Sequence, residues 1–193
     1  MARAIWSGAV SFGLVNVPVR LYSATESKDV RFHEFQQGTG RRIRHERVAE
    51  GTDQEVPYED VVKGYEYADG QYVTLTQEEL EAAQPERTRG IAIEDFVELA
   101  DVDPIFFQKT YYLDPGPGAE KPYALLLRAM EETGRVGIAR FVFRTKEHLA
   151  AIRPMDGLLV LETMFFADEV RDVGDIDGVP AQADLDQREV DMA

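Results

Sequence analysis

The sequence predicts a protein built mainly from β-strands, with a few helices. Short stretches rich in β-branched and aromatic residues recur along most of the chain, and most are bounded by Gly, Pro or Asp. The pair Asp69-Gly70 lies between two such stretches and is the strongest short signal for a β-hairpin. Helix-start signals interrupt the strands at two places. A chain of 193 residues is close to the size of one domain and can bury a core.

The clearest strand pattern lies in residues 4–22. Apolar side chains occupy one parity up to Leu14 and the other parity from Val15, so the phase changes near Gly13. Because a slip of one residue exchanges the two faces of a strand, we expect a bulge or bend there. Further strands are expected at residues 30–35, 41–48, 62–67, 71–75, 91–99, 109–113, 136–145, 149–153 and 158–166.

Two helices and an acidic C-terminal stretch complete the predicted organisation. Thr76, followed by Glu79, opens a capping box and a helix that ends by Pro85. Pro122 starts a second helix, which runs to Gly134. We expect one core over residues 1–170. Residues 171–193 are expected to form an acidic linker and the first turns of a helix that is too short alone, which predicts a truncated C-terminal region.

Composition argues against several classes of protein. The chain has no cysteine, no signal-peptide pattern and no run of about 18 apolar residues, so we expect a soluble cytoplasmic protein and no membrane partner. His33, His45 and His148 lack the spacing of a metal site, and residues 116–121 lack the Gly-Lys-Ser/Thr ending of a phosphate loop. We therefore expect no enzyme, no metal and no cofactor.

The charge is acidic in sum and uneven along the chain. A net charge of −15 argues against binding to a polyanion, because such binding is driven by Lys and Arg. Residues 1–47, however, carry eight basic and four acidic side chains, whereas residues 48–110 carry four and sixteen. One hypothesis is a polarised surface that binds nucleic acid only along its basic segments, and the alternative is an acidic protein with no polyanion partner.

Residues 40–48 (GRRIRHERV) form the most informative basic stretch. As a strand, this stretch would carry charge on both faces and could not lie over a core. It would project into solvent or onto a charged partner, with phosphate as the natural ligand. An exposed edge strand protected from aggregation by its charge is the alternative. The candidate DNA contacts here are Arg41, Arg42, Arg44 and Arg47.

A second basic face is predicted for the strand at residues 136–145. Its apolar side chains alternate with basic ones, as in any half-buried strand, so the same pattern also fits an ordinary solvated sheet face. The apolar face comprises Gly137, Ala139, Phe141 and Phe143. The opposite, basic face comprises Arg140, Arg144 and Lys146, which Arg128 and Arg153 would extend.

The opening sequence AIWSGAVSFGLVNVPVRLY at residues 4–22 closely resembles the first signature of bacterial Ku proteins. The resemblance covers roughly residues 3–170. It continues at residues 31–33 (RFH), 42–44 (RIR), 63–66 (KGYE), 101–107 (DVDPIFF) and 109–113 (KTYYL). Arg31 lies in one of these matching stretches and joins the candidate DNA contacts.

The resemblance implies a β-barrel core with extended arms, here expected at about residues 28–64, which form a ring with a second copy. It implies sequence-independent binding of double-stranded DNA ends in non-homologous end joining by a non-enzymatic homodimer associated with the nucleoid. It also implies recruitment of an end-joining DNA ligase of the ligase D type. Residues 48–53 replace a Cys-x-x-Cys pair that several relatives carry, so no zinc is expected. The alternative is a dimeric interaction scaffold for repair factors, with weak DNA affinity.

Overall fold

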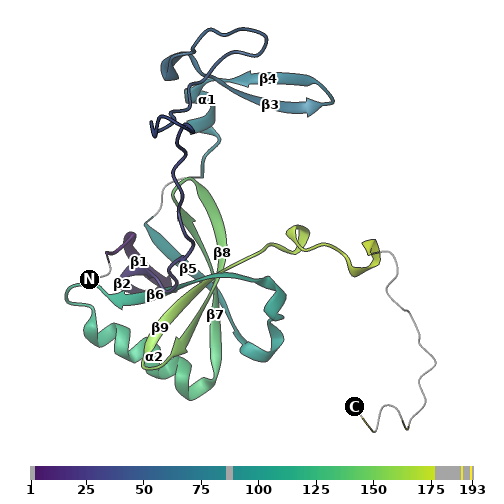
Figure 1. The fold of residues 1–193 in the computed structure, drawn as a ribbon. Coiled ribbons are helices and arrows are strands. Elements are labelled where there is room, and N and C mark those ends of the chain that lie inside the picture. The colour runs from purple at the N-terminus through teal and green to yellow at the C-terminus, as the bar shows by residue number, and fades with distance from the viewer. Residues whose placement is uncertain (1–2, 86–88, 177–187, 189–191, 193) are drawn as a thin grey trace.

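The computed structural model describes residues 3–85, 89–176, 188 and 192. Within these ranges, seven strands close into a barrel in the order β1-β2-β6-β9-β8-β7-β5 (Figure 1). All neighbouring strands in the barrel are antiparallel except β1 and β5. The strands are β1 (Trp6–Phe12), β2 (Val15–Ser23), β5 (Gly90–Glu98), β6 (Phe107–Pro115), β7 (Arg135–Phe143), β8 (Lys146–Met155) and β9 (Leu158–Met164). The prediction of a mainly β fold with a barrel core is confirmed.

The phase change near Gly13 is a hairpin turn between β1 and β2, so the predicted bulge or bend is wrong. Phe12 pairs with Val15, and Gly13 has a φ of 54°, which glycine adopts without strain. Val10 pairs with Val17, and both are fully buried. In this register an even-numbered residue of β1 faces an odd-numbered residue of β2. The change of parity therefore records a reversal of chain direction.

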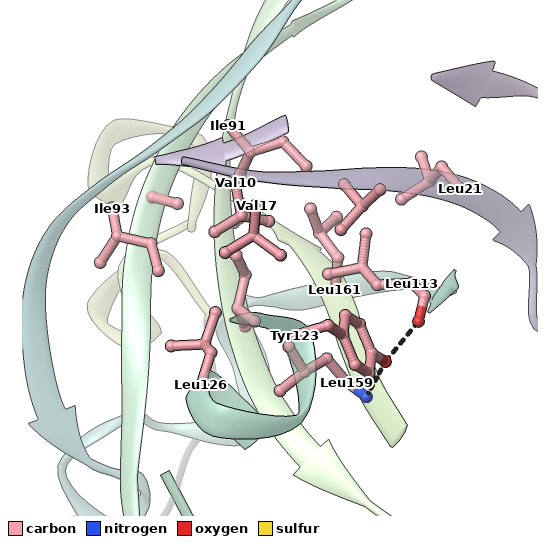
Figure 2. Packing of buried hydrophobic residues seen from close by; sticks show 14 of the residues in the cluster. Val10, Val17, Leu21, Ile91, Ile93, Leu113, Tyr123, Leu126, Leu159 and Leu161 are labelled. Atoms are coloured by element: carbon pink, nitrogen blue, oxygen red, sulfur yellow. Dashed lines mark hydrogen bonds between the residues drawn. The ribbon is translucent and has the colours of Figure 1, made fainter. Parts of the chain in front are cut away.

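The barrel encloses a single apolar core (Figure 2). Helix α2 (Glu120–Thr133) packs its apolar face against it. The Tyr123 hydroxyl donates to the Leu113 carbonyl at 2.5 Å and accepts from the Leu159 amide at 2.7 Å, which joins α2 to β6 and β9. The predicted second helix is confirmed, although it begins at Glu120, and Gly134 ends it in the left-handed conformation.

Seven further strand predictions are confirmed, with ends shifted by at most three residues. They are β3 (Lys63–Ala68), β4 (Gln71–Leu75) and the barrel strands β5 to β9. The strands predicted at residues 30–35 and 41–48 are wrong. Each stretch takes part only in isolated bridges, between Phe35 and Arg42 and between Val48 and Glu55. These residues are exposed, so no packed sheet face holds them in a continuous strand.

Residues 24–85 leave the barrel between β2 and β5, and we call them the projecting segment. Figure 1 shows that this segment extends away from the barrel and carries the β3–β4 hairpin and α1 (Gln77–Ala82). Between residues 25 and 74, only Val56 is not exposed. The predicted hairpin turn at Asp69-Gly70 is confirmed, with Gly70 at a φ of 68°. The capping box of Thr76 and Glu79 is also present.

Short 3₁₀ turns lie at Tyr58–Asp60, Leu99–Asp101, Pro104–Phe106, Ala167–Glu169 and Val173–Asp175. The predicted linker and helix start beyond residue 176 lie largely outside the described residues. Among the helices that the structure describes, none combines the length and apolarity that crossing a bilayer requires.

Candidate nucleic-acid interface

Five candidate arginines lie in the projecting segment, and all are exposed: Arg31, Arg41, Arg42, Arg44 and Arg47. Two narrow turns shape this part of the segment. In the first, the Ile43 amide donates to the Glu34 carbonyl at 2.9 Å, and in the second, the Val56 amide donates to the Arg47 carbonyl at 2.7 Å. The predicted alternation of Arg side chains on two faces of one strand is therefore wrong, because residues 41–48 connect two turns instead of forming a strand.

None of these five arginines has a carboxylate within 4.0 Å in the ranges that the structure describes. Arg42 Nη2 donates to Nδ1 of His33 at 3.0 Å, and the Arg47 guanidinium lies 5.2 Å from the ring centre of Tyr58. Neither contact cancels a positive charge. The guanidinium groups therefore keep their full charge and their remaining N–H donors for an external anion.

The second predicted basic face is divided between elements. Phe143 is the last residue of β7, Arg144 lies in the turn, and Lys146 begins β8 opposite Phe143. The apolar face is confirmed, since Ala139 and Phe141 are buried while Arg140 between them is exposed. The expectation that all three basic side chains share one strand face is wrong, because the chain reverses after Phe143.

Four of the five candidate basic side chains on the barrel have acidic partners. Arg140 lies 3.2 Å from Glu94 and 3.3 Å from Glu147, and Lys146 lies 3.3 Å from Glu169. On α2, Arg128 pairs with Glu132 one turn later at 2.7 Å. These pairs weaken the attraction that Arg128, Arg140 and Lys146 exert on an external phosphate. Their partners are hidden from local sequence patterns, because most come from other strands or from the 3₁₀ turn after β9.

Arg153 forms the most buried of these pairs. Its Nε and Nη2 donate to the two carboxylate oxygens of Glu162 at 2.8 and 3.0 Å. The hydrogen bonds from Arg153 lower the pKa of Glu162, and the same pairing raises the pKa of Arg153. Side-chain exposure is 24% for Arg153 and 10% for Glu162, so this guanidinium is largely enclosed by the barrel.

Lys109 is a basic residue that the sequence reasoning missed as a site residue. It lies on β6, is exposed, and has no carboxylate within 4.0 Å among the described residues. Lys109 and Arg144 line the same cavity. Their proximity results from closure of the barrel, with β9 and β8 between β6 and β7. No local pattern in the sequence indicates it.

A metal ion in the described part of the chain would need a group of side chains that could bind it. Within these ranges, no three His, Asp or Glu side chains come close enough together to hold a metal ion. The arrangement instead combines a closed barrel with an exposed, uncompensated group of arginines on a projecting segment, which suits contact with a polyanion.

The described residues thus define a β-barrel protein with a projecting segment that bears five exposed arginines. The family pattern described as "Ku70/Ku80 beta-barrel domain" matches residues 11–192. The chain therefore belongs to the Ku family.

Three relatives illustrate the similarity. The chain is 50% identical over its full length to the "Non-homologous end joining protein Ku" of Anaeromyxobacter sp. (strain K) and covers 65% of that protein. It is 38% identical, over 99% of its length, to the protein of the same name from Bacillus subtilis (strain 168), of which it covers 62%. It is 41% identical, again over 99% of its length, to the protein of that name from Archaeoglobus fulgidus, of which it covers 76%. The chain thus spans between 62% and 76% of the length of these three relatives.

Proposed function

We propose that the chain binds the ends of double-stranded DNA as a ring-shaped homodimer in non-homologous end joining, without reading base sequence. The observation that carries this proposal is the group of five exposed arginines, free of carboxylate partners in the described ranges, on a segment that projects from the barrel. Residues 28–47, which carry these arginines, have six basic and three acidic side chains, so this stretch attracts a polyanion in a chain with a net charge of −15. The names of the relatives supply the biological setting.

Exposed apolar side chains on the projecting segment support a second copy as partner. Tyr65, Tyr67 and Tyr72 are each more than 60% exposed on the β3–β4 hairpin, and Val73 is 45% exposed. Tyr65 and Val73 form a cross-strand pair on one face, and Tyr72, opposite Glu66, lies on the other. A two-stranded sheet is marginally stable in water, and exposed apolar side chains on both faces favour burial against another surface. Size supports the same conclusion, since a compact domain of this length has a radius of gyration of about 16 Å and cannot enclose a duplex alone.

Phosphate contacts, not base contacts, fit a protein that must accept any broken end. The proposed contacts are Arg31, Arg41, Arg42, Arg44, Arg47, Arg128, Arg140, Arg144, Lys146 and Arg153. The five arginines of the projecting segment and Arg144 contribute most, because the structure gives them no carboxylate partner within its described ranges. Arg128, Arg140, Lys146 and Arg153 contribute less, because each is already paired.

The proposal includes protection of the bound ends and a DNA ligase of the ligase D type as partner. Joining two ends requires a new phosphodiester bond, and we assign that chemistry to the partner. Binding to chromosomal breaks would place the homodimer with the nucleoid.

Charge reversal on the projecting segment tests the proposal. In Arg42→Glu/Arg44→Glu, affinity falls equally for duplexes of unrelated sequence, and the slope of log K against log salt becomes shallower by about 2, or about 1 for each lost phosphate contact. The matched control is Lys121→Glu/Arg135→Glu, which changes the net charge equally at the α2 end of the barrel, away from the projecting segment (Figure 1). An unchanged slope in the first variant contradicts these contacts.

The acidity of the chain favours one second candidate, a dimeric interaction scaffold for repair factors with weak DNA affinity. A stable dimer that binds no duplex even at low salt is the result that would select it.

A further inference from the structure

A cavity of about 480 Å³ opens at the end of the barrel where the projecting segment leaves β2. Its basic lining residues are Lys109, Arg144, Lys146 and His148, from β6, the β7–β8 turn and β8. No carboxylate lines it. Glu169, outside the lining, pairs with Lys146 at 3.3 Å, so the positive charge that attracts an anion to this cavity comes mainly from Lys109 and Arg144.

Two of these cations, Lys109 and Arg144, have no carboxylate within 4.0 Å among the described residues, and each lies near an aromatic ring. Lys109 Nζ lies 5.5 Å from the ring centre of Tyr111, and the Arg144 guanidinium lies 5.5 Å from that of Phe143. The two rings meet edge to face at 6.1 Å. A ring face orients a cation without neutralising it, so both charges are available at the cavity.

Hydroxyl groups and the backbone complete the site. Ser23, Tyr111 and Thr145 also line the cavity. Burial raises the pKa of Tyr111, so its hydroxyl stays protonated and able to donate. Arg144 has a φ of 63°, a left-handed conformation that turns usually give to Gly or Asn. A long cationic side chain is thus held at a position where its backbone conformation is unfavourable, as is common at binding sites.

The geometry points to a phosphate-binding pocket in which Lys109 and Arg144 donate to the oxygens of a DNA phosphate. This inference rests on the proposed function, since it takes DNA as the source of the phosphate. Two kinds of DNA phosphate share the chemistry: an internal phosphodiester with one negative charge, and a terminal monoester with close to two. A phosphate in this cavity lies where the projecting segment leaves β2. One duplex can therefore contact both the cavity and the arginines of the projecting segment.

His148 provides a reporter inside the pocket. Its ring lies 5.7 Å from that of Phe141. Burial and the charge of Lys146 lower the pKa of His148, and Glu169 opposes them. Lys109 and Tyr111 of β6 and Arg144 of the turn line the same cavity. A bound phosphate adds negative charge and therefore raises the pKa of this imidazole.

The test uses the full chain and four proteins: wild type, Lys109→Met, Arg144→Asn, and the charge-matched control Lys121→Met on α2. Asn tolerates the left-handed backbone at position 144, and all three positions are exposed, so equal thermal unfolding is expected. The first measurement follows the His148 ring signals by NMR while inorganic pyrophosphate is added. We expect a saturable shift in wild type and in the control, and none in the two pocket variants.

The second measurement is affinity for a linear duplex over a range of salt, with 5′-phosphate or 5′-hydroxyl ends. We expect each pocket variant to lose about tenfold in affinity and about 1 in the magnitude of the salt slope, and the control to match wild type. Equal losses on both duplexes identify an internal phosphodiester, and a loss only on the phosphorylated duplex identifies the terminal group.

Pocket variants that bind both duplexes like the control overturn the inference and leave the proposed function intact. If wild type binds neither duplex, the proposed function fails. In that case a DNA phosphate is ruled out as the ligand as well, and the pyrophosphate titration alone decides whether the pocket takes an anion.

Discussion

Glu162 is a buried carboxylate of β9 whose negative charge is balanced by the guanidinium of Arg153. It is 8% exposed, and it accepts hydrogen bonds from Arg153 and from the Thr110 hydroxyl, the latter at 3.2 Å. Arg153→Met keeps much of the apolar volume but leaves the carboxylate without its cation. We expect a loss of about 2 kcal/mol in the free energy of unfolding, measured by urea denaturation at pH 7.

The control for this prediction is Arg128→Met, which breaks the exposed pair with Glu132 on α2. Exposed pairs of this kind contribute little, so the expected change is below about 0.5 kcal/mol. Equal losses of unfolding free energy in Arg153→Met and Arg128→Met would show that burial does not strengthen the contribution of the Arg153–Glu162 pair to stability.

Titration of Glu162 gives a second prediction at the same scale. Its pKa in the folded protein is lowered from the ordinary 4.5, first by the hydrogen bonds from Arg153. The stabilisation is therefore fully present above about pH 4.5 and is lost as the pH falls through the lower folded value. The difference in unfolding free energy between wild type and Glu162→Gln should shrink over that range. A difference that stays constant from pH 6 to pH 3 would exclude this linkage.

At the scale of single residues, the sequence predicted which side chains are exposed better than it predicted which side chains form ion pairs. Charge on both parities of residues 40–48 correctly excluded a core position, and the arginines there are exposed. The carboxylates that pair with Arg140 come from β5 and β8, and the partner of Arg153 comes from β9. Such pairs depend on strand register, which the sequence does not display.

At the scale of elements, Tyr123 fastens α2 to the barrel. Its hydroxyl donates a hydrogen bond to the Leu113 carbonyl of β6 and accepts one from the Leu159 amide of β9. Tyr123 is only 6% exposed. Tyr123→Phe leaves both backbone groups without this partner, and we expect a loss of about 2 kcal/mol in thermal or urea unfolding. Tyr112→Phe is the matched control, because that side chain is on the outside of β6, and it should be nearly neutral.

The predictability of an element depended on whether a core lay beneath it. All seven barrel strands contribute residues to the core, and all were found from apolar alternation or short apolar runs, although β1 and β2 were read as one bent strand. The β3–β4 hairpin was found through its Asp-Gly turn instead. Residues 24–62 contact no core, and their propensity for strand was not realised. Barrel closure, which brings Lys109 to Arg144, joins strands distant in sequence.

At the scale of the whole molecule, charge is unevenly distributed: residues 1–47 carry eight basic and four acidic side chains, whereas residues 48–193 carry 13 and 32. The net charge of −15 coexists with arginines on the projecting segment and with the cationic cavity at its root. Acidic side chains repel DNA, so among the described residues we expect a duplex to be attracted chiefly to these arginines and to the cavity. If the proposed function holds, this uneven charge lets an acidic protein bind DNA, and we expect an affinity that depends strongly on salt.

Threading onto free ends is the central claim, and it is tested most directly by comparing a linear duplex with the same duplex closed into a circle. Gel shift at low salt should be accompanied by the mass of the free protein in solution. We expect the free protein to be a dimer that retards the linear duplex and leaves the circle unbound, because a closed ring cannot pass onto DNA without an end. Equal retardation of the two forms, or binding by a monomer, would contradict it.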